Sequence, residues 1–149
     1  MIYNKARLAA AAFACLCAGP ASAQCLVIGD SIAVGLAGQF SRCESRAKVG
    51  LPSGAIARLA TGAPTAEWAA ISAGSNDPAN RALRGNLEAI RQKVRAGRVI
   101  WIVPRNAQAA AAVRAVAGAH GDSSVAFSSG RDGVHPRSYP TLARGVGAS

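Results

Sequence analysis

The chain has 149 residues, half of them hydrophobic, and a formal net charge of +10 at pH 7. This length allows one domain, and the composition is typical of a globular protein and excludes an intrinsically disordered chain. The positive charge predicts attraction to polyanions. The Lys and Arg residues are scattered, however, and no aromatic residues are interleaved with them, so we expect a solvated basic surface and no specific nucleic-acid binding.

Residues 1–23 have the pattern of a secretory signal peptide. Two cations, Lys5 and Arg7, precede an apolar run that a Gly-Pro pair breaks, and the next three residues read Ala-Ser-Ala, a small-x-small cleavage pattern. The apolar run is too short for a resident membrane helix, although an uncleaved anchor is the alternative. We predict cleavage after Ala23, which lowers the net charge to +8 by removing both cations. Residues 24–149 then form a secreted or periplasmic domain without stable membrane insertion.

Short apolar runs alternate with helical patterns through the rest of the chain. The expected strands are residues 25–28, 44–49, 68–73, 98–103 and 124–127. The expected helices are residues 31–40, 53–62, 81–95, 107–117 and 136–146, with Gly97 closing the third, Gly118 closing the fourth and Pro136 near the start of the last. This alternation predicts an α/β domain with a three-layer flavodoxin-like fold. Its five-stranded parallel sheet should have the order 2-1-3-4-5, with right-handed crossovers.

Cys25 and Cys43 are the two cysteines that follow the predicted signal peptide. Two cysteines in an oxidising compartment suggest one disulfide. The first strand and the first helix should run antiparallel, which returns Cys43 to the end of the sheet where Cys25 begins. The bond would stabilise the fold by about 3 kcal/mol, and two free thiols are the alternative. With so few candidate ligands we expect no metal site, and no cofactor is expected.

Four polar motifs follow the expected strands: Gly29-Asp30-Ser31, Gly50, Gly74-Ser75-Asn76-Asp77 and Asp132-Gly133-Val134-His135. The carboxyl ends of parallel strands meet at one edge of the sheet, where α/β proteins bind ligands. Each motif also has an ordinary interpretation: a helix cap, a turn, an Asx turn before a proline, or a loop histidine. The ordinary interpretations do not require one shared edge, so the four motifs together predict a functional site.

The residue types at this edge match the needs of nucleophilic catalysis. A serine hydroxyl such as that of Ser31 is a weak nucleophile until a base takes its proton, and His135 lies in a loop suited to that task. Asp132 is close enough in sequence to hold the other ring nitrogen of His135. The N–H groups of Ser31 and Gly50 and the side-chain amide of Asn76 could stabilise a developing oxyanion.

These motifs resemble the four sequence blocks of the SGNH hydrolases, also called GDSL-type esterases and lipases. The blocks are Gly-Asp-Ser, an isolated glycine, Gly-x-Asn-Asp and Asp-x-x-His, and they occur here in the family's order over nearly all of the chain beyond the signal peptide. The resemblance implies a flavodoxin-like fold with Ser31 as nucleophile, and with Asp132 and His135 completing a triad. It also implies an oxyanion hole formed by Ser31, Gly50 and Asn76.

The predicted function is that of a secreted serine esterase that hydrolyses ester bonds through an acyl-enzyme. No lid or long apolar groove is recognisable, which favours short acyl groups, for example acetyl esters on an acylated polysaccharide. Members of the family usually carry additional loops around the pocket, so an open, shallow site is expected here. The alternative from another class is a catalytically degenerate, secreted basic protein that binds anionic glycans.

Overall fold

A computed structural model describes residues 22–149. Most of the predicted signal peptide, residues 1–21, lies outside the described residues. Ser22 and Ala23 belong to the first strand, where they pair with the third strand. Cleavage after Ala23 stays a prediction.

Five parallel strands form the sheet, in the predicted order β2-β1-β3-β4-β5. The strands are β1 (Ser22–Gly29), β2 (Glu44–Ala47), β3 (Thr65–Ser72), β4 (Ala96–Ile102) and β5 (Ser123–Val125). The carboxyl halves of β1, β3 and β4 are continuously buried because helices cover both faces of the sheet. Their side chains alternate between the two faces, so that neighbours such as Ile28 and Ile71 share one register position.

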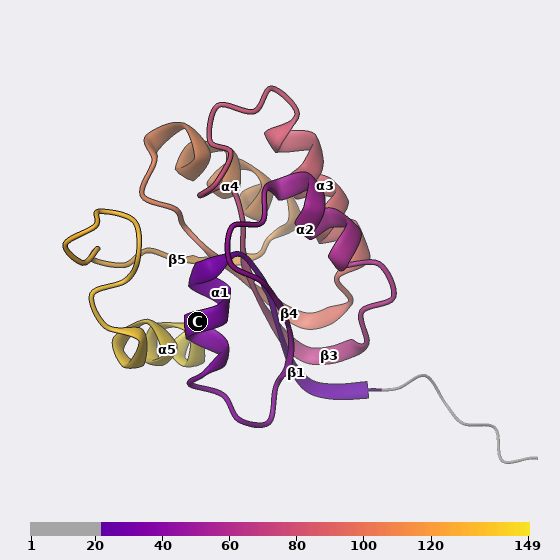
Figure 1. Ribbon diagram of the computed structural model, residues 1–149. Helices are drawn as coiled ribbons and strands as arrows, with labels where there is room; N and C mark the ends of the chain where they lie inside the picture. Colours follow the sequence, from indigo (N-terminus) through magenta and orange to yellow (C-terminus); the bar gives the residue numbers. More distant parts are fainter. Residues whose placement is uncertain (1–21) are drawn as a thin grey trace, which may run out of the picture.

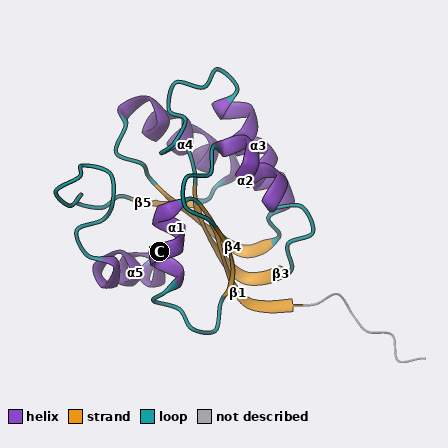
Figure 2. Ribbon diagram, viewed as in Figure 1, coloured by secondary structure: helices purple, strands orange, loops and turns teal. Residues whose placement is uncertain are grey.

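The helices form the two outer layers of a three-layer fold. They are α1 (Ser31–Ala37), α2 (Ser53–Leu59), α3 (Leu83–Lys93), α4 (Ala107–His120) and α5 (Tyr139–Ala148). Helices α2, α3 and α4 cover one face of the sheet, and α1 and α5 cover the other (Figures 1 and 2). Each face has its own apolar cluster, with Ile56, Leu87 and Val113 on the first and Ile32 and Leu142 on the second. The predicted α/β architecture is confirmed.

Two predicted helix stops at glycine are wrong. Helix α4 continues past Gly118, because a glycine inside a helix costs only about 1 kcal/mol. It ends at His120, and the C-cap residue Gly121 has a left-handed φ of +67°. Helix α3 ends at Lys93, so Gly97 does not close it. Gly97 lies inside β4, and a Cβ added at this position would lie only 3.0 Å from the carbonyl oxygen of Glu67 in β3.

The last helix begins at Tyr139 and not near Pro136, as the sequence had predicted. Ser138 caps this helix, because its hydroxyl accepts a hydrogen bond from the N–H of Thr141. Pro136 belongs to the preceding loop, where it forms an isolated bridge with Ser129. The loop between β5 and α5 therefore runs from Ala126 to Ser138 and is longer than the pattern of apolar residues predicts.

The other element boundaries lie within three residues of the predictions. Strands β1, β3 and β4 begin earlier than predicted, at Ser22, Thr65 and Ala96. Elements α1, β2, α2 and β5 end earlier, at Ala37, Ala47, Leu59 and Val125. After α1 the N–H groups of Gln39 and Phe40 bond to carbonyls three residues back, which is the tighter turn typical of helix ends.

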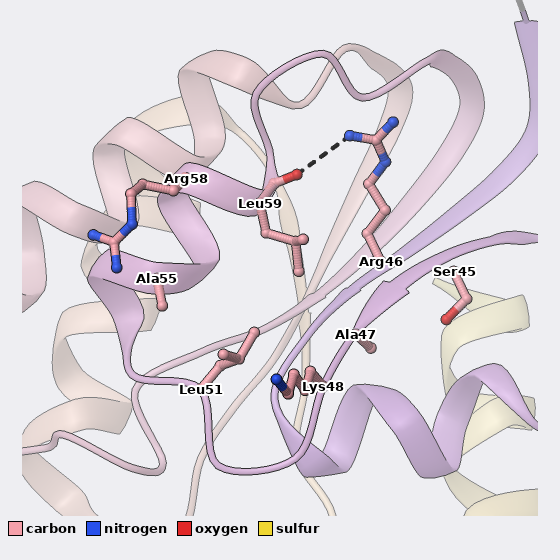
Figure 3. A pocket seen from close by; sticks show the side chains of 8 residues that line it. All are labelled: Ser45, Arg46, Ala47, Lys48, Leu51, Ala55, Arg58 and Leu59. Carbon is pink, nitrogen blue, oxygen red and sulfur yellow. Dashed lines mark hydrogen bonds between the residues drawn. The ribbon is translucent and has the colours of Figure 1, made fainter.

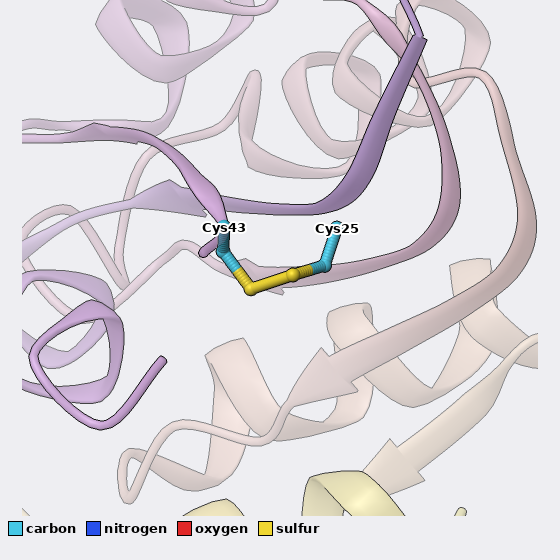
Figure 4. The surroundings of a disulfide bond; sticks show 2 residues. All are labelled: Cys25 and Cys43. Carbon is cyan, nitrogen blue, oxygen red and sulfur yellow. A yellow bond between two sulfur atoms is a disulfide. The ribbon is translucent and has the colours of Figure 1, made fainter. Parts of the chain in front are cut away.

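The predicted disulfide between Cys25 and Cys43 is present, with a Cα–Cα distance of 4.6 Å (Figure 4). Cys25 lies in β1, and Cys43 directly precedes β2. Phe40 and Trp68 pack edge-to-face nearby, with ring centroids 5.1 Å apart. The bond ties the loop after α1 to β1, whereas the corner at Ser31 follows the carboxyl end of that strand.

Candidate active site

The turn between β1 and α1 combines a close backbone approach with a buried cap. Gly29 has a φ of +145°, and a Cβ at this position would lie 1.9 Å from the carbonyl oxygen of Ser72, so only glycine fits. Asp30 is fully buried and caps α1, because its Oδ1 accepts the N–H of Ile32 at 3.0 Å. The capping interpretation of this motif is thus correct for Asp30. The hydroxyl of Ser31, the first residue of α1, therefore has no role in capping the helix.

The hydroxyl of Ser31 meets the loop of the fourth motif. Ser31 Oγ lies 2.8 Å from His135 Nε2, and His135 Nδ1 lies 2.6 Å from Asp132 Oδ2. The other carboxylate oxygen of Asp132 accepts the N–H groups of Val134 and His135, each at 3.0 Å. A carboxylate in this position requires a proton on Nδ1 of His135, which leaves Nε2 free to accept the Ser31 proton.

The electrostatics of this loop keep Asp132 ionised. The hydrogen bond from the His135 side chain, together with those from the backbone N–H groups of Val134 and His135, lowers the pKa of Asp132 from 3.8 to about 2, and the His135 side chain is the largest cause. An ionised carboxylate can hold one tautomer of the imidazole and stabilise its protonated form. The side chains of His135 and Asp132 are 40% and 53% exposed, so the pair is open to solvent.

Sheet order brings the loops of the other two motifs beside Ser31. Because β1 lies between β2 and β3, the loop with Gly50 and the loop with Asn76 flank the Ser31 corner. Gly50 has a φ of +77°. Within residues 22–149, no hydrogen bond occupies the backbone N–H of Ser31 or of Gly50. Both groups therefore remain able to donate to a ligand.

The amide of Asn76 is held by the loop on the other side of Ser31. Its Nδ2 lies 3.0 Å from the carbonyl oxygen of Leu51. Since a carbonyl only accepts, the nitrogen of the amide must face Leu51. One amide hydrogen makes this bond, and the second remains for another acceptor. The contact links the segment after Gly50 to the loop that follows β3.

A polar network around the buried Ser53, which the sequence did not predict, supports the same link. Ser53, the buried first residue of α2, donates its hydroxyl to Asp77 Oδ2 at 2.6 Å and its N–H to Oδ1 at 3.0 Å. Asn86 of α3 donates to the Ser53 hydroxyl at 2.9 Å. The sequence pattern predicts only an Asx turn for Asp77, next to Asn76. In the fold it anchors α2, and with it the loop that carries Gly50.

Tyr139 packs behind the site, where α5 meets α1. Its ring fills the space that a side chain at Gly35 would need, with Cζ only 2.2 Å from the Cβ position. Burial raises the pKa of Tyr139, and the negative charges of Asp30 and Asp132 raise it further. The phenol therefore stays neutral at physiological pH.

A groove of about 640 Å³ lies between β2 and α2, on the Gly50 side of the site (Figure 3). Lys48 and Leu51 lie at the end of the groove nearest the site, since Lys48 N–H donates to Gly29 and Leu51 accepts from Asn76. Arg46 lines the groove too, but it donates to three carbonyls in and after α2. Its guanidinium stabilises the turn that follows α2 and is therefore not free to bind a ligand.

None of the helices in residues 22–149 is both long and apolar enough to cross a membrane. Over the same residues, no three His, Cys, Asp or Glu side chains are grouped as metal ligands.

The chain was compared with known families, curated proteins and solved structures. No family model matches it, and no curated protein matches it. It is similar to the solved C-terminal catalytic domain of peptidoglycan O-acetyltransferase A from Streptococcus pneumoniae, which carries a methylsulfonyl adduct. The identity is 21% and the TM-score 0.46, over 68% of this chain and 62% of that domain. The chain thus spans less than two thirds of that domain, and the likeness carries no statement about activity.

Proposed function

We propose that this chain is a serine hydrolase of the SGNH type that cleaves ester bonds. The observation that carries the proposal is the continuous hydrogen-bonded chain from Ser31 Oγ through His135 to Asp132, at 2.8 and 2.6 Å. Nucleophile and base are within hydrogen-bonding reach, and a third group orients the base, which is the arrangement that nucleophilic catalysis by serine requires.

The first half of the reaction forms an acyl-enzyme. His135 Nε2 takes the proton of Ser31 as Oγ attacks the ester carbonyl carbon, and ionised Asp132 stabilises the imidazolium. The carbonyl oxygen becomes an oxyanion, which accepts hydrogen bonds from the N–H groups of Ser31 and Gly50 and from the second amide hydrogen of Asn76. The intermediate then collapses, the bond to the alcohol oxygen breaks, and His135 gives its proton to that oxygen.

The second half releases the acid. Water attacks the acyl carbon while His135 takes one of its protons, and a second oxyanion forms at the same donors. This intermediate breaks its bond to Ser31 Oγ, which recovers a proton from His135. The products are the alcohol and the carboxylic acid, and the enzyme returns to its starting state.

Short acyl groups on a polymeric alcohol suit a site this open. His135 and Asp132 are each at least 40% exposed, so a polysaccharide carrying acetyl esters can reach the nucleophile without entering a channel. We further propose that the protein acts outside the cytoplasm after cleavage following Ala23. The disulfide between Cys25 and Cys43 supports an oxidising compartment.

A fluorophosphonate probe tests the proposal directly, because it reacts with activated serines. Wild-type protein should be labelled at Ser31 and should hydrolyse p-nitrophenyl acetate. Ser31→Ala should lose both properties, whereas Ser41→Ala, which removes an exposed hydroxyl from a turn, should retain both. Folded wild-type protein that is neither labelled nor active would overturn the proposal in favour of the glycan-binding alternative.

Acyl specificity needs a second experiment. Rates on p-nitrophenyl esters of increasing chain length should fall from acetate to octanoate, because an open site offers little apolar surface to a long chain. A rate that rises with chain length would contradict the preference for short acyl groups and leave the serine mechanism standing.

A further inference from the structure

A second cavity, of about 320 Å³, lies directly against the site on the side away from β2. We call it the Arg105 cavity, and its lining residues are Ser75, Arg105, Asn106, Gly133 and Val134. Ser75 immediately precedes Asn76, and Gly133 and Val134 lie between Asp132 and His135 in sequence. The cavity therefore borders both the loop of the proposed base and the loop of one proposed oxyanion donor.

The polar groups that line this cavity are donors without acceptors. Arg105 is exposed and forms no ion pair with any residue from 22 to 149. The hydroxyl of Ser75 is buried and has no hydrogen-bond partner in the described part of the chain. Asn106 uses its carbonyl oxygen to cap α4, accepting the N–H groups of Gln108 and Ala109, which leaves its amide hydrogens. Such a lining suits an anion.

The state of Arg105 contrasts with that of an arginine that has an internal partner. Arg91 donates to both oxygens of Asp122, at 2.6 and 3.0 Å, in the fork geometry that carboxylates and guanidinium groups favour. None of the residues lining the Arg105 cavity is acidic, and the nearby Asp132 carboxylate is already held by His135 and two backbone N–H groups. A carboxylate that meets Arg105 must therefore come from a ligand.

The chemistry of ester cleavage indicates which part of the substrate would lie there. The imidazolium of His135 protonates the leaving oxygen, so the alcohol part must lie on the His135 side of the carbonyl carbon. Gly133 and Val134 put the Arg105 cavity on that side. Its volume is at the small end of the range for ligand pockets, about 300–1,000 Å³, and fits one unit of a larger molecule.

We propose that the Arg105 cavity binds a carboxylate on the alcohol part of the ester, which makes O-acylated acidic glycans, with uronic-acid-type units, the substrate class. This inference rests on the proposed hydrolase function. Arg105 pairs with the carboxylate, and the exposed amide of Asn106 adds a hydrogen bond. Arg105 is a specificity-determining residue in this scheme and takes no part in bond making or breaking.

Two small acetate esters that differ in one group test the proposal: 3-acetoxybenzoate, which carries a carboxylate, and 3-acetoxybenzamide, which carries a neutral carboxamide of similar size. The measured quantity is the ratio of their kcat/KM values. Wild-type protein should favour the benzoate, and Arg105→Gln should lower the ratio by roughly tenfold to a hundredfold, as expected for loss of a charge-assisted hydrogen bond. The loss should appear in KM, and Arg105→Lys should recover part of the preference.

The matched control is Arg84→Gln, which removes the same charge from an exposed position on α3. It should leave the ratio at the wild-type value. An equal fall in both variants would assign the preference to the field of the whole basic protein and overturn the proposed subsite. A wild-type ratio that Arg105→Gln does not change would overturn it as well.

Binding of the product 3-hydroxybenzoate separates this inference from the hydrolase proposal. In Ser31→Ala protein, titration with 3-hydroxybenzoate should shift the backbone amide NMR signals of Ser75, Arg105 and Gly133, and the added change Arg105→Gln should abolish the shifts. If these shifts occur but the wild-type protein cleaves no ester, the hydrolase proposal is overturned and the anion subsite stands. Ester cleavage by the wild type without these shifts would overturn the subsite and keep the hydrolase.

Discussion

The hydroxyl of Ser72 donates a hydrogen bond of 2.8 Å to Oδ1 of Asp30, and both side chains are shut off from solvent. A backbone hydrogen bond joins the same two residues, because the N–H of Asp30 donates to the carbonyl oxygen of Ser72 at 3.2 Å. Asp30 immediately precedes Ser31, and Ser72 ends the strand that leads to Asn76. The two residues therefore fix the nucleophile's turn to the neighbouring strand.

Loss of this bond should destabilise the fold. Ser72→Ala leaves the buried Asp30 carboxylate with one donor fewer, which should lower the free energy of unfolding by about 1–3 kcal/mol. Urea denaturation measures the difference. Ser41→Ala, at an exposed turn, should change stability by less than about 0.5 kcal/mol. Equal effects of the two changes would show that the Ser72 hydroxyl contributes nothing specific.

Asn76→Ala should lower kcat for p-nitrophenyl acetate by about a hundredfold to a thousandfold, because one preorganised oxyanion donor is removed. Steady-state kinetics measures this effect, and denaturation of the same variant reports any cost of losing the bond to Leu51. A change confined to KM would assign Asn76 to binding of the ground state instead.

Two glycine-to-alanine changes in helices should have opposite signs. Gly85→Ala in α3 meets open space and should stabilise the fold by about 0.5–1 kcal/mol. Gly35→Ala in α1 drives its Cβ against the ring of Tyr139 and should destabilise by about 1–3 kcal/mol. Thermal unfolding of both variants checks the pair, and a stabilised Gly35→Ala would mean that Tyr139 moves aside without cost.

The titration of Asp132 should reveal its bond to His135. A carbon-13 NMR titration should place the pKa of Asp132 at about 2, and His135→Ala should raise it toward 3.8, because the largest cause of the shift is removed. A folded pKa below the unfolded one means that Asp132 adds stability above 3.8, and that this stability is lost as the pH falls toward 2. The stability difference between wild type and Asp132→Asn should therefore narrow over that interval. A constant difference would contradict the shift.

Reduction of the disulfide should lower the free energy of unfolding by about 3 kcal/mol. Mass spectrometry should find the oxidised chain two hydrogens lighter than the dithiol, with the Cys25 and Cys43 peptides linked. The Cys43→Ser variant, which cannot form the bond, should be insensitive to reductant. Fluorophosphonate labelling of Ser31 should survive reduction, since the bond lies away from the catalytic edge. Loss of labelling would show that the disulfide affects the geometry at the opposite, catalytic edge of the sheet.

Some features of this protein follow from the sequence alone because local patterns determine them. Apolar runs that alternate with helical spacing specify strands and helices, and the rule of right-handed, short connections leaves few ways to order five parallel strands. The pairing of Cys25 with Cys43 followed from the same antiparallel course of β1 and α1. The gathering of Ser31 and His135 at one edge was predictable because both follow the carboxyl ends of strands.

Only the tertiary structure decided the contacts that join distant segments, because a local pattern reports on chain neighbours and not on what packs across a face. The bond of Ser53 to Asp77 depends on how α2 settles against the sheet. The Arg105 cavity exists only because three loops meet there. The end of α4 also involves a distant segment: beyond Gly118 the helix reaches His120, whose Nε2 lies 2.7 Å from Oε2 of Glu88 in α3.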